Sequence, residues 1–239
     1  MPARFFVQPL PPAGPATVDG DLAHHLAHVL RARPGDSLRL ADGRGGSAMA
    51  TVTAVRRHAV DLEVDASVQA AAVGSGVQIA FAPPRLQRAE WLFEHGTEVG
   101  IDVFHPLWTA RTRPQGERLE RWQRIVRAAA GQCDRDWLPT IAPPRELAAF
   151  LRDAALPAAR FVATPGAPPL PALAPATGDV LVLIGPEGGF AADEAEAAQA
   201  AGFVAAGLAP HVLRTETAAL VAAALLRCRP GAPARRPEA

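Results

Sequence analysis

Lysine and tyrosine are both absent from the 239 residues of this chain, and all 24 basic residues are arginines. Any contact with a phosphate group must therefore come from arginine, from backbone N–H groups or from neutral donors. The excess of alanine, proline and arginine is typical of a genomic composition bias. We therefore infer no function from the absence of lysine.

Cysteine is scarce too, and long apolar runs are missing. Cys133 and Cys228 form no CxxC pair and no metal-ligand spacing with the histidines. The spacing does not exclude a disulfide, but it favours two buried or idle thiols. Apolar runs such as residues 180–184 are far too short to span a membrane. The first seven residues have no signal-peptide pattern. We therefore expect a cytoplasmic protein.

The charge balance is neutral, with 24 acidic residues against the 24 arginines. A net charge of zero argues against a protein that coats nucleic acid by charge alone. Hydrophobic residues make up 49% of the chain and charged residues 20%, which is enough apolar material for a core. The composition therefore predicts a folded globular protein.

The first 70 residues are predicted to be mostly β-structure around one helix. A short strand is expected at residues 4–7 and a helix at 19–31, and short alternating strands follow up to residue 64. This pattern is typical of a small β-barrel. Residues 69–76 are small and featureless, so we place a linker and a domain boundary there.

From residue 77 onward strands alternate with helices. Strands are predicted at residues 77–82, 103–107, 161–163, 180–184 and 203–208, and helices at 86–99, 119–129, 193–201 and 215–227. This alternation predicts a mostly parallel sheet covered by helices, so that the chain is α/β in this part and α+β overall.

A glycine-rich turn follows the apolar run at residues 180–184. It reads Gly185-Pro186-Glu187-Gly188-Gly189 and lies where α/β proteins bind ligands, at the carboxyl end of a parallel strand. It matches neither a Walker loop nor GxGxxG, which argues against a phosphate cradle. By itself the segment fits a plain turn and a ligand loop equally well.

A second segment, residues 208–218, leads from a strand into an Ala- and Leu-rich helix. Thr215 is a candidate N-cap, with Arg214 and Glu216 on either side. The two charges could be solvated and inert, as most surface charges are. A helix N-terminus near a glycine-rich loop is also a natural place for an anionic group.

Arginines cluster near the predicted helix at residues 119–129, at positions 111, 113, 118, 121, 124 and 127. A solvated helix face is a better explanation than an RNA-binding face when this stretch is taken alone. His24 and His28 have the i, i+4 spacing of a metal pair, but no third ligand is near them in sequence. We therefore expect no metal site.

Taken together, the motifs are more specific. Ile184-Gly185-Pro186-Glu187-Gly188-Gly189-Phe190, followed by residues 212–218 (Val-Leu-Arg-Thr-Glu-Thr-Ala), resembles the bacterial 16S rRNA (uracil-N3)-methyltransferase family of the SPOUT class. The likeness extends to the Arg-Phe-Phe start at residues 4–6 and to residues 25–31, 90–100 and 118–135. It therefore covers most of the chain.

The resemblance implies a PUA-like, RNA-binding β-barrel at residues 1–70 and a trefoil-knotted SPOUT methyltransferase domain at residues 77–232. It further implies a homodimer, S-adenosyl-L-methionine as the cofactor, and the small ribosomal subunit as the partner. The implied reaction is methylation of N3 of one uridine of 16S rRNA, at the family's site U1498. A SPOUT enzyme acting on another rRNA or tRNA nucleotide, or an inactive PUA-type RNA-binding protein, stays open.

Site residues follow from the same resemblance, position by position. Cofactor-binding residues are expected in three loops: Thr164, Pro165, Ile184, Gly185, Glu187, Gly188, Gly189, Leu208, Val212 and Leu213. Arg214 and Glu216 are assigned to catalysis, and RNA contacts are assigned to Arg4, Arg31, Arg111, Gln132 and Arg135. The chain departs from the family at Ala209-Pro210, where glycine usually follows the leucine, and at Cys133-Asp134, where Ser-Gly is usual.

Overall fold

A computed structural model describes residues 2–70, 76–112 and 118–229 of the chain. These residues form two compact units: the first holds residues up to 70 together with 130–138, and the second holds 76–129 and 139–229. The sequence pattern places the boundary in the linker alone and gives no sign that residues 130–138 join the first unit. Among the described residues, no helix is long and apolar enough to cross a membrane.

The first unit is built on a sheet with the strand order β1-β3-β4-β5-β2, and β6 pairs with β4. Its strands are β1 (Arg4–Phe6), β2 (Gly14–Asp19), β3 (Ser37–Ala41), β4 (Gly46–Val55), β5 (Ala59–Val64) and β6 (Val68–Gln69). Inward side chains alternate along them, among them Leu38 and Leu40 on β3 and Val60, Leu62 and Val64 on β5. This alternation is the one that the sequence predicts. Gln69, expected in the linker, instead belongs to a strand.

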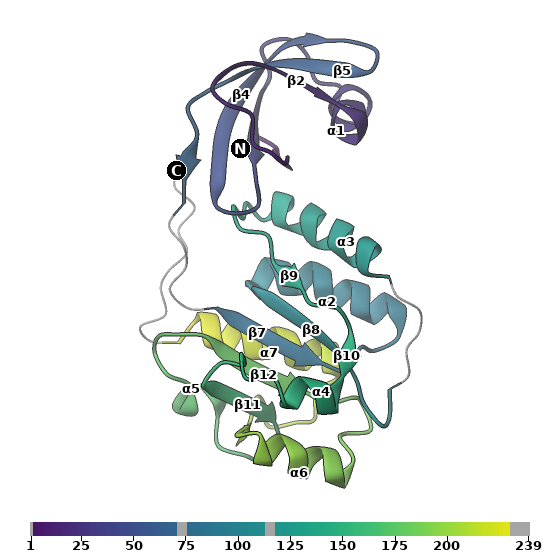
Figure 1. The fold of residues 1–239 in the computed structure, drawn as a ribbon, viewed down its shortest axis with the longest axis vertical. Coiled ribbons are helices and arrows are strands. Elements are labelled where there is room, and N and C mark those ends of the chain that lie inside the picture. The colour runs from purple at the N-terminus through teal and green to yellow at the C-terminus, as the bar shows by residue number, and fades with distance from the viewer. Residues whose placement is uncertain (1, 71–75, 113–117, 230–239) are drawn as a thin grey trace. The chain divides into compact units, whose positions relative to one another are not determined.

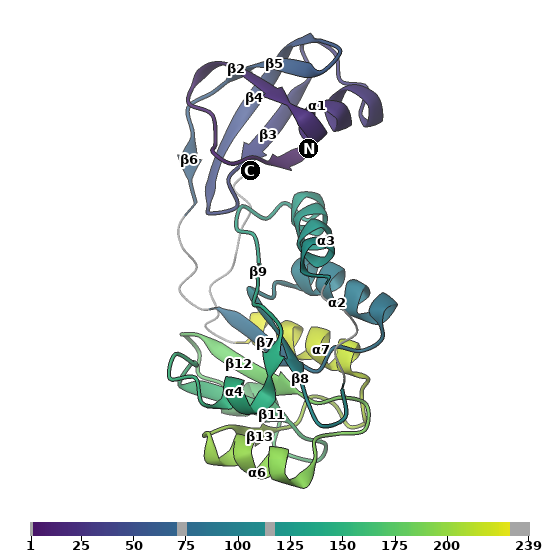
Figure 2. The same cartoon turned by 45° about the vertical axis from the view of Figure 1, so that its right-hand side comes forward.

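The helix expected at residues 19–31 is shorter and contains a π-helical segment. It consists of α1 (Gly20–His24) and η1 (His25–Val29), and α1 contacts β2 and β5 (Figure 2). Asp19 precedes it but makes no capping bond through its side chain. Leu26 is buried, whereas Val29 and Leu30 are exposed at the end of the helix. Arg31 follows with a φ of 54°, so the helix ends in a left-handed residue.

A buried arginine fastens residues 130–138 to the first unit. The Arg4 guanidinium is ion-paired with Asp134 at 2.7 Å and Asp136 at 3.0 Å, and its side chain is 1% exposed. Burial lowers the pKa of Arg4 from its ordinary value, and the two aspartates oppose that effect. Backbone bonds from Gly45 N–H to Asp136 O and from Leu138 N–H to Gly43 O complete the attachment.

The second unit contains a parallel sheet with the order β10-β8-β7-β12-β11-β13, and β9 pairs with β8. Its strands are β7 (Val77–Phe81), β8 (Val103–Trp108), β9 (Thr140–Ile141), β10 (Arg145–Glu146), β11 (Ala159–Ala163), β12 (Val180–Ile184) and β13 (Val204–Ala206). Its helices are α2 (Leu86–Val99), α3 (Leu119–Gln132), α4 (Leu147–Leu151), α5 (Leu170–Leu173), α6 (Ala192–Ala200) and α7 (Thr215–Arg227); α3 ends in residues of the first unit. The predicted parallel α/β arrangement is confirmed.

Strand β12 lies at the centre of this sheet, and all five of its residues are buried. Val180, Val182 and Ile184 face a core shared with α2 and α7, while Leu181 and Leu183 face one shared with α4 and α6. Figure 1 shows these helix pairs on opposite faces of the sheet. Cover on both faces explains why the strand is a continuous apolar run rather than an alternating one.

The shortest elements of the second unit are not predicted by the sequence pattern. Strands β9 and β10 have two residues each, α5 has four and α4 has five. Helices this short carry little more than one period of a helical pattern and strands this short a single alternation, so periodicity cannot reveal them. The longer elements agree closely: α2 and α7 have the predicted bounds.

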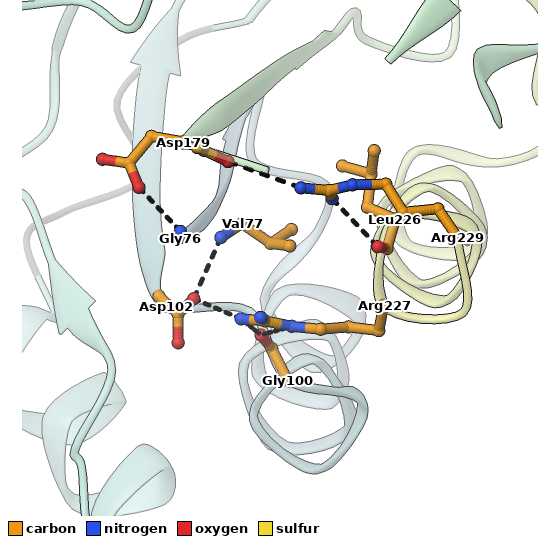
Figure 3. A network of polar contacts seen from close by, with 9 residues as sticks. Gly76, Val77, Gly100, Asp102, Asp179, Leu226, Arg227 and Arg229 are labelled. Atoms are coloured by element: carbon orange, nitrogen blue, oxygen red, sulfur yellow. Dashed lines mark hydrogen bonds and ion pairs between the residues drawn. The ribbon is translucent and has the colours of Figure 1, made fainter. Parts of the chain in front are cut away.

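The carboxyl end of α7 is held at the amino edge of the parallel sheet (Figure 3). Arg227 donates to the Gly100 carbonyl through Nε at 2.9 Å and Nη2 at 2.6 Å, and it pairs with the Asp102 carboxylate. Asp102 in turn accepts a hydrogen bond from the Val77 N–H at 2.9 Å. The next arginine, Arg229, is buried and donates to the Leu226 carbonyl at 2.9 Å. This set of bonds, called the α7 clamp below, joins the helix to the starts of β7 and β8.

A partly buried polar contact lies between β7, β8 and α4. The His105 Nε2 atom is 3.0 Å from Gln78 Oε1, and the His105 ring packs on Phe150 with centroids 5.3 Å apart. Burial, with a smaller contribution from the nearby Arg145, lowers the pKa of His105 to about 4, and Asp153 opposes it. The imidazole is therefore neutral at pH 7.

This neutral histidine predicts acid sensitivity. In the unfolded chain His105 has its ordinary pKa of 6.5, whereas in the folded protein its pKa is about 4. Between these two values the unfolded chain binds more protons than the folded protein, so the free energy of unfolding falls as the pH drops through this window. At pH 5 the free energy of unfolding should be about 2 kcal/mol lower than at pH 7 because of this residue. In urea unfolding, the free energy of unfolding of His105→Gln should fall by about 2 kcal/mol less than that of the wild type between pH 7 and pH 5. Parallel losses in the two proteins would contradict the prediction.

Candidate active site

Three loops meet at the carboxyl edge of the parallel sheet, because β12, β11 and β13 are neighbours and run in the same direction. The first loop follows β11, the second follows β12 and the third follows β13. The Thr164 N–H donates to the Ala206 carbonyl at 2.9 Å and so links the first loop to the end of β13, where the third loop begins. On its other side β12 pairs with β7. From β7 the chain continues to β8 toward one edge of the sheet, and from β12 it continues to β13 toward the other edge, so the direction of the connections reverses between β7 and β12. Open α/β sheets bind ligands at such a reversal point.

Gly207 brings the first and third loops into backbone contact. Its N–H donates to the Pro168 carbonyl at 2.8 Å, and its carbonyl accepts from the Leu170 N–H at 2.9 Å. A Cβ atom on Gly207 would lie 2.4 Å from the Ala167 carbonyl oxygen, so only glycine fits here. The sequence analysis missed this residue. The available signal was a glycine directly after the strand at residues 204–206.

The glycine-rich loop after β12 is tied to the start of α7. The loop closes through a bond from the Gly189 N–H to the Pro186 carbonyl at 2.8 Å, with Gly189 at a φ of 73°. Thr215 Oγ1 donates to the Gly185 carbonyl at 2.9 Å. We expected Thr215 to cap its own helix, but Arg214 occupies the N-cap position, and no side chain makes a capping bond there. The threonine hydroxyl is used to join two loops instead.

Arg88 of α2 contacts two carboxylates, Glu187 in the glycine-rich loop and Glu216 at the start of α7. Glu216, in the first turn of α7, is 6% exposed, and its Oε1 is 3.6 Å from Arg88 Nε. Its Oε2 is buried and has no hydrogen-bond partner among the described residues. Arg88, on α2, also pairs through Nη1 with Glu187 of the glycine-rich loop. An unsatisfied buried carboxylate oxygen is costly, which makes it a candidate ligand-binding atom.

The segment after β8 lies against the glycine-rich loop. Arg111 Nη1 donates to the Gly188 carbonyl. Nearby, the Glu194 carboxylate accepts from the Ala110 N–H at 2.7 Å and from the Ala191 N–H at 2.9 Å. One carboxylate therefore bonds both the β8 loop and the start of α6. Arg113 of the predicted basic stretch lies outside the described residues.

The ten predicted cofactor residues all lie in the three converging loops or at the ends of their strands. Ile184 is buried and Leu208 and Leu213 are half-buried against the core, whereas Pro165, Glu187, Gly188 and Gly189 are exposed. Val212 is 80% exposed, an unusual position for a large apolar side chain on a folded unit. The edge therefore offers backbone groups, small residues and exposed apolar surface.

The five predicted RNA contacts are divided between the two units and differ in exposure. Arg4 and Arg135 are buried in the first unit, and the Arg4 guanidinium is already engaged by two aspartates. Arg31 and Gln132 are exposed in that unit, whereas Arg111 is exposed in the second. The arginines of α3 face solvent, and Arg121 among them pairs with Glu90.

Other candidate groups do not build a site. The rings of His24 and His28 lie 4.7 Å apart. In the part of the chain that the structure describes, no group of three or more His, Cys, Asp or Glu residues could hold a metal ion. The Cys133 thiol donates to the Ala130 carbonyl at 3.8 Å, and Cys228 is exposed.

Comparison with known proteins decides the family. The model of an RNA methyltransferase domain matches residues 74–227, and that of an RNA methyltransferase PUA domain matches residues 18–65. The chain belongs to this RNA methyltransferase family. As a member it is an RNA methyltransferase, and the resemblance inferred from its motifs is confirmed.

Relatives of the family match over nearly the whole chain. Ribosomal RNA small subunit methyltransferase E of Mycobacterium bovis is 36% identical over 231 residues, which cover 91% of this chain and 88% of the relative. The Synechocystis protein of the same name is 35% identical and covers 84% of this chain and 69% of the relative. The Neisseria gonorrhoeae protein of that name, solved bound to S-adenosyl methionine, has a TM-score of 0.87 at 26% identity, with 95% and 97% of the two chains covered.

Proposed function

We propose that this chain transfers a methyl group from S-adenosyl-L-methionine to N3 of one uridine in 16S rRNA, at the family's site U1498. The observation that carries the proposal is the meeting of three loops at the carboxyl edge of the parallel sheet, with the buried Glu216 at the start of α7, in a member of the RNA methyltransferase family. The matched relatives are small-subunit rRNA methyltransferases, which supports the choice of RNA.

The residues at the sheet edge fit the cofactor. S-adenosyl-L-methionine combines a sulfonium, an amino group and an adenine, and therefore needs hydrogen-bond acceptors as well as apolar surface. The three loops offer exposed backbone at Gly188 and Gly189 and an exposed apolar side chain at Val212. We propose that these loops hold the cofactor largely through backbone atoms.

Once bound, the cofactor supplies an electrophilic methyl group whose bond to sulfur breaks as the bond to uracil N3 forms. The protein must align the two reactants and remove the N3 proton, which is weakly acidic. We assign proton removal to the Glu216 carboxylate. Arg214, exposed at the N-cap of the same helix, is assigned to orient the uracil and to stabilise its developing negative charge.

RNA recognition is divided between the two parts of the chain in this proposal. Residues 1–70 act as the PUA-type RNA-binding domain and residues 77–232 as the methyltransferase domain. Arg31 and Gln132 of the first unit and Arg111 of the second offer exposed donors to RNA. Arg4 and Arg135, both buried, are assigned instead to support the first unit from within.

We further propose the SPOUT trefoil knot for the methyltransferase domain and a homodimer as the working form. The outer face of α7 supports the dimer, because it carries half-buried apolar side chains outside the core: Leu220, Val221, Ala224 and Leu225. A second copy of the chain would bury this stripe. The cytoplasm, where small subunits are assembled, is the proposed location, and no metal is required.

Mass spectrometry of 16S rRNA from a strain lacking this protein tests the substrate. We expect one methyl group to disappear from a single uridine, and the purified protein with S-adenosyl-L-methionine to restore it on small subunits from that strain. Loss of a methyl from a different nucleotide would reassign the target within the same enzyme class. An unchanged rRNA pattern, with normal cofactor binding in a titration, would overturn the rRNA assignment.

A further inference from the structure

Glu187 and Glu216 come from two different loops of the candidate site, and Arg88 of α2 contacts both. Its Nη1 pairs with Glu187 Oε1, and its Nε lies 3.6 Å from Glu216 Oε1. The two carboxylates differ in environment, since the Glu187 side chain is 62% exposed and that of Glu216 only 7%. Arg88 thus connects the glycine-rich loop at the surface with the buried carboxylate at the start of α7.

The shape of the guanidinium explains how one residue serves both loops. Its donors lie in a rigid plane with fixed directions, so a guanidinium held by one carboxylate also fixes the position of its second contact. In this arrangement Oε1 of Glu216 faces a cation, while Oε2 keeps no partner among the described residues. The arginine therefore distinguishes the two oxygens of a symmetric carboxylate.

We propose that Arg88 is a positioning residue for methyl transfer, which orients Glu216 so that Oε2 stays available for the N3 proton and which couples that orientation to the glycine-rich loop through Glu187. This inference rests on the proposed function of Glu216. Arg88 itself touches neither reactant. Its loss is expected to impair the chemical step more than cofactor binding, because the loops keep their other hydrogen bonds, such as that from Thr215 Oγ1 to the Gly185 carbonyl.

Steady-state kinetics and cofactor titration of the full-length protein test the proposal. Arg88→Gln is expected to lower kcat at least tenfold, while the Kd for S-adenosyl-L-methionine changes less than threefold. Arg85→Gln is the matched control: it removes the same charge at the start of the same helix, from an exposed residue to which we assign no role at the site. It should keep kcat within twofold of the wild type.

Two further variants test whether Arg88 acts as a bridge between Glu187 and Glu216 or only as a positive charge near Glu216. Arg88→Lys keeps the charge but lacks the planar fork, so it should remain at least threefold below the wild type in kcat. Glu187→Gln added to Arg88→Gln should lower kcat no further, because both changes break the same bridge. The kcat values are compared at saturating S-adenosyl-L-methionine, so that any part Glu187 plays in binding the cofactor does not enter the comparison. Should Arg88→Gln fail to fold, the comparison of Arg88→Lys with Arg85→Gln decides.

An Arg88→Gln enzyme as active as Arg85→Gln overturns the proposal, as does a loss of cofactor affinity equal to the loss in kcat. An additive loss in the double variant overturns the bridge. If the wild type transfers no methyl group to 16S rRNA, the proposed function fails and this inference fails with it. A fully active wild type with unaffected Arg88 variants removes the positioning role alone.

Discussion

Glu216→Gln is expected to reduce kcat by about a hundredfold to ten-thousandfold, the usual effect of removing a general base. Glutamine has the same shape but accepts no proton, so the uracil must lose its N3 proton without help. The Kd for S-adenosyl-L-methionine should change less than threefold. Methyl transfer to small subunits that lack the modification, measured in single turnover, gives the rate of the chemical step.

Raising the pH should restore part of the rate of Glu216→Gln, because more of the uracil is then already deprotonated. The companion variant Arg214→Ala should also lose about a hundredfold in kcat, but without this rescue by pH. The exposure of Arg214 makes that variant safe for folding. Full turnover of Arg214→Ala would end its assignment, and a pH-independent defect in Glu216→Gln would end the role of Glu216 as the base.

Gly207→Ala is expected to abolish most cofactor binding and to weaken the fold. The added methyl group would lie 2.4 Å from the Ala167 carbonyl oxygen, and both backbone groups of Gly207 are already bonded to the first loop. The third loop must therefore move away, at a cost of about 1–3 kcal/mol in stability. We expect at least a tenfold rise in the Kd for S-adenosyl-L-methionine, measured by calorimetry.

Gly178→Ala separates loss of cofactor binding from loss of stability. Gly178 has a φ of 86° with open space around its Cα, so alanine should cost about 1–2 kcal/mol through backbone strain alone. This residue precedes β12, at the edge of the sheet opposite the site, so cofactor affinity should stay unchanged. A Gly207→Ala protein that binds the cofactor as tightly as Gly178→Ala would contradict the proposed loop contact.

The longer elements could be predicted because periodicity decides them. Val180–Ile184 is a short apolar run that ends at a glycine-rich turn, which favours a buried strand, and the Ala- and Leu-rich composition of α7 favours a helix. The attachment of residues 130–138 to the first unit could not be predicted. It depends on Arg4, which reads as a surface cation in sequence but is buried between two aspartates about 130 positions away.

The candidate site was predictable as a set of loops but not as a set of contacts. The glycine-rich turn and the residues around Arg214 stand out in the sequence, and the parallel sheet brings them to one edge. The contacts of Arg88 and of Gly207 depend on which strands become neighbours. A single sequence read for periodicity contains no information on that order, so neither Arg88 nor Gly207 could be assigned to the site from it.

The α7 clamp has a consequence for which changes of length the chain tolerates. The helix is bonded to the carboxyl edge of the sheet through Thr215 and to the amino edge through Arg227. Its 13 residues span about 20 Å, close to the roughly 16 Å of the five-residue strand β12 beneath it. Deleting one residue from the helix would turn one end by about 100° against the other, so only one of the two attachments could survive. Insertions and deletions in this helix should therefore be tolerated far less than conservative substitutions on its outer face.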